Sequence, residues 1–140
     1  MNFDATLNKY RPYALAALRI ATALAFMAHG TQKLFGFPES RMGSPELLSL
    51  MGIAGILEVF GGLAILLGLF TRPVAFILSG QMAYAFWFMH AANAGTVIPV
   101  ANGGDGAMLF CFVFFYLVFS GPGAWSADEA LKSRRSLATA

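Results

Sequence analysis

Four long apolar segments constrain this chain more than any other feature of its sequence. They cover about residues 12–35, 46–70, 73–92 and 104–120, and each is roughly 17 to 25 residues long. About 20 apolar residues in a helix cross the roughly 30 Å hydrocarbon core of a bilayer. The composition agrees, because 58% of the residues are hydrophobic and only 11% are charged. We therefore predict an all-α membrane protein: a bundle of four transmembrane helices in the lipid bilayer, forming one domain over residues 1–140.

Proline and glycine mark the expected ends of these helices. Pro12, Pro45 and Pro73 are predicted to lie at the start of the first three. The run Gly121-Pro122-Gly123 is predicted to end the fourth, which leaves residues 121–140 as a tail.

The basic residues predict the orientation of the bundle. Arg41, beside two glutamates, is the only basic residue in the first-to-second connection, and the third-to-fourth connection contains none. The positive-inside rule then places both termini and the turn between the second and third helices in the cytoplasm. The basic residues on that side are Lys9, Arg11, Arg72, Lys132, Arg134 and Arg135.

Charge and cysteine content exclude several function classes. A formal net charge of +2 is too small to suggest a nucleic-acid partner. Cys111 is the single cysteine, so an intramolecular disulfide and a CxxC redox pair are both excluded.

Three ionisable side chains interrupt the first apolar segment on one helical face. Arg19, His29 and Lys33 fall within an arc of about 80° on an α-helix. Because a charged side chain facing lipid is costly, we expect this stripe to face the interior of the bundle. Arg19 also interrupts the apolar run that a cleaved signal peptide would need, so we expect the segment to be retained.

Glu58, near the middle of the second segment, is the expected acidic partner of this stripe. By helical rise it lies about 7 Å from the levels of Arg19 and His29, a gap that an arginine side chain can span. In one interpretation, an ion pair between Glu58 and Arg19 fixes the helix packing, since buried charges are normally paired. In the other, Glu58 and the stripe form one wall of a ligand or proton site, because ionisable residues inside membranes are commonly functional.

The third segment adds Gln81 and Tyr84 on one face and His90 near the outer end. His90 is predicted to lie level with His29, but it follows Gln81 by nine positions and so points about 180° away on an α-helix. Both can face one cavity only if the helix deforms or lies between two neighbours. A site with two imidazoles and one carboxylate is an alternative to hydrogen-bonded packing histidines. The spacing matches no recognised ligand pattern, and we predict no metal.

The connection before the fourth segment contains a polar turn, Asn102-Gly103-Gly104-Asp105. We predict that Asp105 caps the fourth helix. Alternatively, Asn102 and Asp105 close the outer mouth of the polar pocket, and Asp105 or Glu58 would supply the carboxylate of a metal site. No catalytic residue is assigned, and the candidate ligand-binding residues are Arg19, His29, Lys33, Glu58, Gln81, Tyr84, His90, Asn102 and Asp105.

Four stretches together carry a resemblance to a known family. In order, LRIATALAFMAHGTQKLFGF, GILEVFGGLAILLGLFTRPVA, NGGDGAMLF and GPGAWSADE resemble motifs of the DoxX family of small bacterial four-helix membrane proteins. Asp105 and Ala127 depart from the pattern, where a glutamate and a larger apolar residue are expected. The residues that match are Arg19, His29, Gly30, Lys33, Glu58, Gly61, Gly62, Arg72, Asn102, Gly103, Gly104, Gly121, Pro122, Gly123, Ser126 and Asp128.

The resemblance implies a multi-pass protein of the bacterial cytoplasmic (inner) membrane that is associated with quinone-linked oxidoreductases. The sequence shows no haem, flavin, nicotinamide or dithiol signature. We therefore expect an accessory subunit and not a complete enzyme. A quinone-like molecule would then bind in the polar pocket, with His29 and Lys33 donating to its oxygens and Glu58 placed for proton exchange. The alternative is a non-catalytic membrane adaptor or a small transporter whose charges only lock the bundle. Whether the chain assembles with redox-complex subunits or with copies of itself is left open.

The predicted topology can be tested by cysteine labelling. With Cys111 removed, a cysteine at Thr96 should react with a membrane-impermeant thiol reagent from outside intact cells, and one at Ala138 should react only from the cytoplasmic side. Labelling of both positions from outside would contradict the orientation.

Overall fold

The computed structural model describes residues 3–39 and 45–138, and in these ranges every regular element is helical. Three helical stretches are long and apolar enough to cross a membrane: Phe3–Phe35, Leu50–Leu67 and Thr71–Ala94. A fourth apolar helix, Asp105–Ser120, is shorter. Each predicted apolar segment therefore forms a helix. Arg41, counted in the predicted outer connection, lies outside the described residues.

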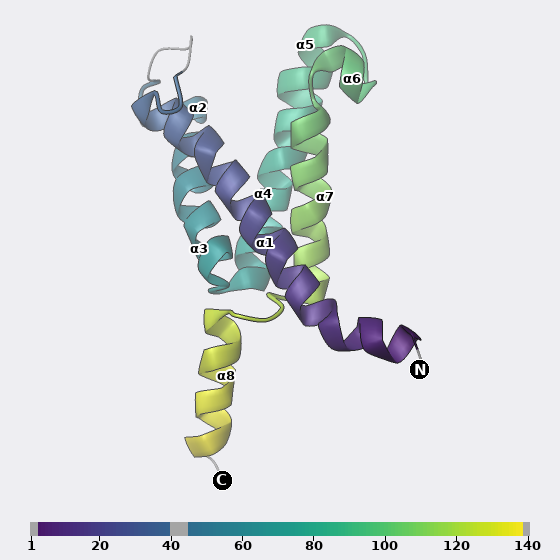
Figure 1. Cartoon of the computed structure of the whole chain (residues 1–140). Helices are drawn as coiled ribbons and strands as arrows, with labels where there is room; N and C mark the ends of the chain where they lie inside the picture. The colour runs from purple at the N-terminus through teal and green to yellow at the C-terminus, as the bar shows by residue number, and fades with distance from the viewer. Residues whose placement is uncertain (1–2, 40–44, 139–140) are drawn as a thin grey trace.

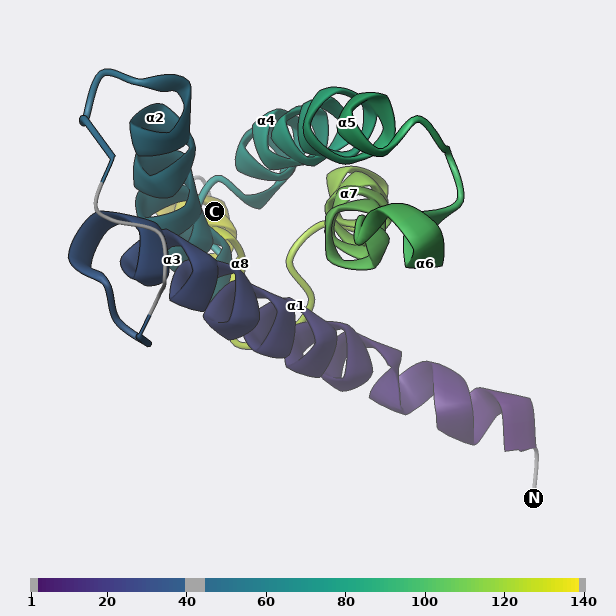
Figure 2. The same cartoon turned by 90° about the horizontal axis from the view of Figure 1, so that it is seen from above.

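The first helix begins earlier than its proline. Helix α1 (Phe3–Phe35) contains Pro12 in its interior, so the prediction that Pro12 opens the helix is wrong. Proline removes one backbone donor and bends a helix, but it does not have to end it. The part of α1 before Pro12 bends away from the rest of the helix in Figure 2.

The next two helices also begin away from the predicted prolines. The second begins at Leu50 and not near Pro45, because the Ser49 side chain caps it by accepting a hydrogen bond from Gly52 N at 3.1 Å. The third begins at Thr71, which places Pro73 inside the first turn, where the missing N–H has no helical partner to lose.

Both of these helices contain a π-helical segment. The second consists of α2 (Leu50–Ile56), η1 (Leu57–Gly61) and α3 (Gly62–Leu67). The third consists of α4 (Thr71–Tyr84), η2 (Ala85–Ala91) and α5 (Ala92–Ala94). A π turn holds more residues than an α turn, so the side chains that follow it are rotated relative to those before it.

A short helix, α6 (Pro99–Asn102), precedes α7 (Asp105–Ser120). The prediction that Asp105 caps α7 is wrong: Gly104 is the cap residue and Asp105 lies in the first turn. The Asn102 carboxamide oxygen accepts from Gly104 N at 2.7 Å, so the asparagine closes the turn that the aspartate was expected to close. The predicted tail contains one further helix, α8 (Ala127–Ala138).

The helices form two pairs that meet at one end and diverge at the other. Helix α1 packs along α2, η1 and α3, and α4 packs along α7. Figures 1 and 2 show the two pairs joined near the α3–α4 turn and separated near α2 and α5. The buried core at the joined end contains Phe26 and Phe114, with ring centroids 4.8 Å apart in an edge arrangement. Around them lie the buried residues Ala23, Ile65, Ala75, Leu78 and Leu117.

Arg19 holds the segment after α7 against this joined end. Its side chain is fully buried, and it donates from Nη1 to Pro122 O and from Nη2 to Trp125 O, each at 2.9 Å. The predicted pairing of Arg19 with Glu58 is therefore wrong. The backbone carbonyls of a non-helical segment need hydrogen-bond donors. The carbonyls of Pro122 and Trp125 lie closer to the Arg19 guanidinium than the Glu58 carboxylate does.

Asp128 fixes the start of α8 to the start of α4. Its two carboxylate oxygens accept from Phe70 N at 2.8 Å and Thr71 N at 2.9 Å, and its own N–H donates to Gly68 O at 2.9 Å. Burial raises the pKa of this carboxyl, but the backbone N–H groups of Thr71 and Phe70 and the charge of Arg19 outweigh it, so the pKa is lowered. The stabilisation is therefore complete above the unfolded pKa and is lost as the pH falls through the folded pKa.

We expect Arg19→Met to destabilise the protein strongly. The substitution leaves the carbonyls of Pro122 and Trp125 without their donors, and a hydrogen bond to a charged group contributes about 1.5 to 3 kcal/mol. Thermal unfolding in detergent should show a loss of about 3 kcal/mol or more. Arg134→Met on exposed α8 is the control and should change little. An unchanged melting temperature for Arg19→Met would contradict this role.

Candidate functional site

A cavity of about 740 Å³ opens between the two helix pairs, toward the end where they diverge. Its volume lies within the range of pockets that bind small molecules. Most of the wall is apolar, and polar side chains gather on the sides formed by α1, η1 and α4. The apolar lining includes Leu50, Met51, Ile53, Leu57, Ile77, Met82, Met89 and Phe110.

The polar side is organised around Glu58, which is 1% exposed. Lys33 Nζ on α1 lies 2.5 Å from Glu58 Oε1, and Gln81 Nε2 on α4 donates to the same oxygen at 3.2 Å. The lysine side chain is 20% exposed, so this is a largely buried ion pair at the cavity wall. Glu58 therefore pairs with Lys33, the residue at the outer end of the predicted stripe.

Close approach of α1 and η1 brings this pair together. A Cβ atom at Gly30 would lie 2.8 Å from both Glu58 Cβ and Val59 N, so only glycine allows the two backbones to come this near. Lys33 follows Gly30 by about one turn on the same helix, and its side chain then reaches the carboxylate.

Two buried acceptors beside the cavity have no hydrogen-bond donor among the described residues. They are Glu58 Oε2 and Gln81 Oε1. The Gln81 amide cannot be turned over at no cost, because its nitrogen faces two other acceptors, Glu58 Oε1 and Ala54 O. Buried polar atoms normally find partners, so the site is suited to a group that donates hydrogen bonds.

Both histidines line the same cavity, from opposite sides. His29 on α1 packs edge-on against Phe110, with ring centroids 5.8 Å apart. His90 lies in η2, and its Nδ1 is 3.3 Å from Asn102 O. The π turns of η2 rotate His90 back toward the face of Gln81, which is one of the two ways expected for both residues to face one cavity.

The remaining candidate residues divide into two groups. Tyr84 lines the cavity and stacks on Phe88, with ring centroids 4.7 Å apart. Arg19, Asn102 and Asp105 do not line it. Asn102 is used within its own turn, where Nδ2 donates to Thr96 O at 3.0 Å. Among the described residues no three His, Cys, Asp or Glu side chains gather as metal ligands, so the alternative with two imidazoles and one carboxylate is not formed.

Sequence reasoning missed Gln32 and the apolar half of the lining. The methionines Met51, Met82 and Met89 and the ring of Phe110 face the cavity from three helices. No local pattern distinguishes these side chains from those that face lipid, because both surroundings are apolar. Gln32 had a signal, since it is a polar residue beside Lys33 near the end of an apolar segment.

Several bacterial proteins are similar to this chain over most of its length. An uncharacterised protein of Haemophilus influenzae (strain Rd) is 49% identical over 130 residues, covering 88% of this chain and 94% of that protein. Inner membrane protein YphA of Escherichia coli (strain K12) is 30% identical over 130 residues, covering 85% of this chain and 91% of YphA. Inner membrane protein YqjF of the same organism is 27% identical over 138 residues, covering 91% and 99%. No solved structure matches the chain.

The apolar helices and these relatives define a multi-pass helical protein of the inner membrane. A model of the DoxX family matches residues 14–91, which is more than half of the chain. The chain therefore belongs to the DoxX family, and the resemblance found in the sequence is confirmed.

We expect Lys33 and Glu58 to be energetically coupled. Breaking a buried pair at one partner costs about 3 to 5 kcal/mol, because the other charge is left unpaired, whereas replacing both by apolar residues costs much less. A double-mutant cycle with Lys33→Met and Glu58→Leu, read by thermal unfolding in detergent, measures the coupling.

The same cycle with Arg19→Met and Glu58→Leu is the control and should give additive losses, since Arg19 is bonded elsewhere. Additive losses for Lys33 and Glu58 would contradict the ion pair.

Proposed function

We propose that this protein is an accessory subunit of a quinone-linked redox complex and that its cavity binds a quinone or quinol. The proposal rests on one observation: a buried cluster of polar side chains lies at the wall of a largely apolar cavity. The cluster consists of Lys33, Glu58 and Gln81. Binding and proton transfer are assigned to this chain, and electron transfer to a partner subunit.

The proposal includes four membrane crossings within one domain, with both termini in the cytoplasm. At 1.5 Å per residue, the 16 residues of α7 extend about 24 Å, so α7 crosses most of the hydrocarbon core. The start of α1 and the end of α8 lie at the same end of the bundle in Figure 1, which supports an even number of crossings.

The polar groups of the cavity match the two oxidation states of such a ligand. Quinone oxygens accept hydrogen bonds, and Lys33 and His29 on α1 are donors that line the cavity with Glu58. Quinol hydroxyls donate, and Glu58 Oε2 and Gln81 Oε1 are buried acceptors without a donor. Glu58 is thus placed to take up a proton from a bound hydroxyl, with Lys33 stabilising the carboxylate.

The shape of the site supports an amphipathic ligand that enters from the bilayer. The cavity lies between helix pairs that separate toward one end, so its apolar side continues toward lipid. A ring would lie against Phe110 and the methionines, which make favourable contacts with aromatic groups. An apolar tail would leave between the pairs.

The alternative function is a non-catalytic adaptor or small transporter. The direct contact of Lys33 with Glu58 favours it, because a closed ion pair by itself only locks the bundle. The two functions differ in whether His29, whose ring packs edge-on against Phe110 at this cavity, matters for ligand binding.

A binding titration on purified variants tests the proposal. We expect the parent protein in detergent to bind the short-chain ubiquinone-1, and His29→Gln to bind it about tenfold more weakly, because glutamine cannot take up a proton as imidazole can and the loss of one hydrogen bond changes affinity by about that factor. Lys33→Arg should weaken binding less than Lys33→Met, since arginine keeps the charge. Thermal unfolding on the same samples separates loss of binding from loss of fold.

Ser79→Ala is the matched control. Ser79 is buried on the face of α4 toward α7, where its hydroxyl donates to Cys111 O at 3.0 Å, and it does not line the cavity. Its binding should equal that of the parent protein. A His29→Gln protein that binds ubiquinone-1 as tightly as the parent would refute the ligand site and favour the adaptor.

A further inference from the structure

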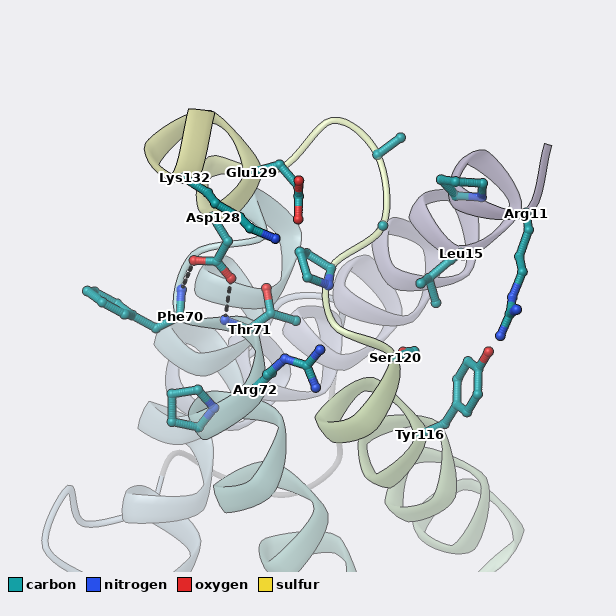
Figure 3. A pocket seen from close by; sticks show the side chains of 15 residues that line it. Arg11, Leu15, Phe70, Thr71, Arg72, Tyr116, Ser120, Asp128, Glu129 and Lys132 are labelled. Carbon is teal, nitrogen blue, oxygen red and sulfur yellow. Dashed lines mark hydrogen bonds between the residues drawn. The ribbon is translucent and has the colours of Figure 1, made fainter. Parts of the chain in front are cut away.

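A second cavity lies at the opposite end of the molecule, where the helix pairs meet. It has a volume of about 710 Å³ and lies between the N-terminal part of α1, the first turn of α4, the end of α7 and the start of α8 (Figure 3). No candidate residue of the first cavity lines it. The two cavities share no lining residue.

Three basic side chains from three different elements line this cavity. Arg11 comes from α1, Arg72 from α4 and Lys132 from α8, and all three are exposed. None of them forms an ion pair with a described acidic residue. Figure 3 shows Lys132 and Arg72 on one side of the cavity and Arg11 on the other, and a bound anion would relieve the repulsion among these like charges.

Arg72 is held in place at the cavity by the end of α7. Its Nη1 donates to Val118 O at 2.6 Å and Phe119 O at 2.7 Å, which leaves the other edge of the guanidinium toward the cavity. A guanidinium fixed in this way presents its remaining donors in a planar arrangement suited to phosphate oxygens. Figure 3 also shows the Arg11 side chain pointing toward the hydroxyl of Tyr116, which adds a neutral donor from α7.

Two acidic residues also line the cavity, but only one of them is available to oppose an anion. Both carboxylate oxygens of Asp128 are engaged by the N–H groups of Phe70 and Thr71. Glu129 is exposed, and Figure 3 shows its carboxylate pointing from α8 into the space between the lining side chains. The net charge that faces a ligand is therefore positive, and the negative charge of Glu129 weakens the binding of an anion.

The position of the cavity indicates which anion it meets. It lies at the level where the apolar run of α7 ends at Ser120 and that of α4 begins after Arg72. Exposed apolar side chains, Phe76 and Phe119, continue from this level along the same helices. The surface thus changes from basic to apolar along the membrane normal, as a phospholipid does from phosphate to acyl chain.

We propose that this cavity binds the phosphate group of an anionic phospholipid, with its acyl chains against the apolar surface of α4 and α7. Arg72 and Lys132 contact the phosphate oxygens, and Arg11 and Tyr116 close the site from the side of α1 and α7. The site fixes the lipid at the end of the bundle where α7 ends and α8 begins.

Binding of defined lipids to the delipidated full chain in detergent tests the proposal. Phosphatidylglycerol should raise the melting temperature, whereas phosphatidylcholine and inorganic phosphate at the same concentration should not. Arg11→Gln and Lys132→Gln should each weaken the apparent affinity for phosphatidylglycerol about fivefold, the effect of one basic residue near an anionic membrane surface. Glu129→Gln should strengthen it.

Arg134→Gln is the matched control, because Arg134 lies on α8 but does not line the cavity, and it should bind phosphatidylglycerol as the parent does. Arg72→Gln is less informative, since it also removes the bonds to the end of α7. Equal affinities for phosphatidylglycerol in Arg11→Gln, Lys132→Gln and the parent would overturn the proposal, as would equal stabilisation by phosphatidylcholine. Equal stabilisation by inorganic phosphate would overturn the assignment to a lipid.

Discussion

The rest of the structure depends on the two hydrogen bonds that the Arg19 side chain donates. A guanidinium buried in an apolar bundle needs acceptors, and the acceptors here are the carbonyls of Pro122 and Trp125, far along the chain. The segment after α7 must therefore fold against α1. Asp128 then caps the start of α4, so both helix pairs are tied together at one end. Because they are joined there, they can diverge at the other end, where the larger cavity lies.

The ion pair of Lys33 and Glu58 lies in a buried position, where a pair of charges is not needed for stability. An apolar pair of similar volume would often stabilise a buried contact equally well, so charges at such a position call for another reason. Their position at the wall of an apolar cavity, where Glu58 Oε2 and Gln81 Oε1 have no donor in the described part of the chain, supports ligand binding as that reason. The π segments serve the same geometry, since η1 carries Glu58 and η2 carries His90.

The two cavities lie near opposite ends of α1, and their linings differ in polarity. The cavity near His29 and Lys33 is mostly apolar and contains one buried ion pair, which suits a ring with hydrogen-bonding oxygens. The cavity near Arg11 lies at the polar end and is lined by three cations that form no ion pair with a described acidic residue, which suits an anion. One helix of 33 residues thus contributes to both, and the substitutions for each site lie far apart on it.

The sequence by itself determined the helices, their membrane setting and the polar stripe, because helix length and the 3.6-residue period depend only on local chain geometry. The tertiary structure decided the partners. It joined Glu58 to Lys33, where depth along the helix had favoured Arg19, because the segment after α7 supplies carbonyls that no periodicity reveals. It also turned His90 toward Gln81 through a π segment, since a change in residues per turn arises from packing between helices and leaves no mark in an apolar sequence.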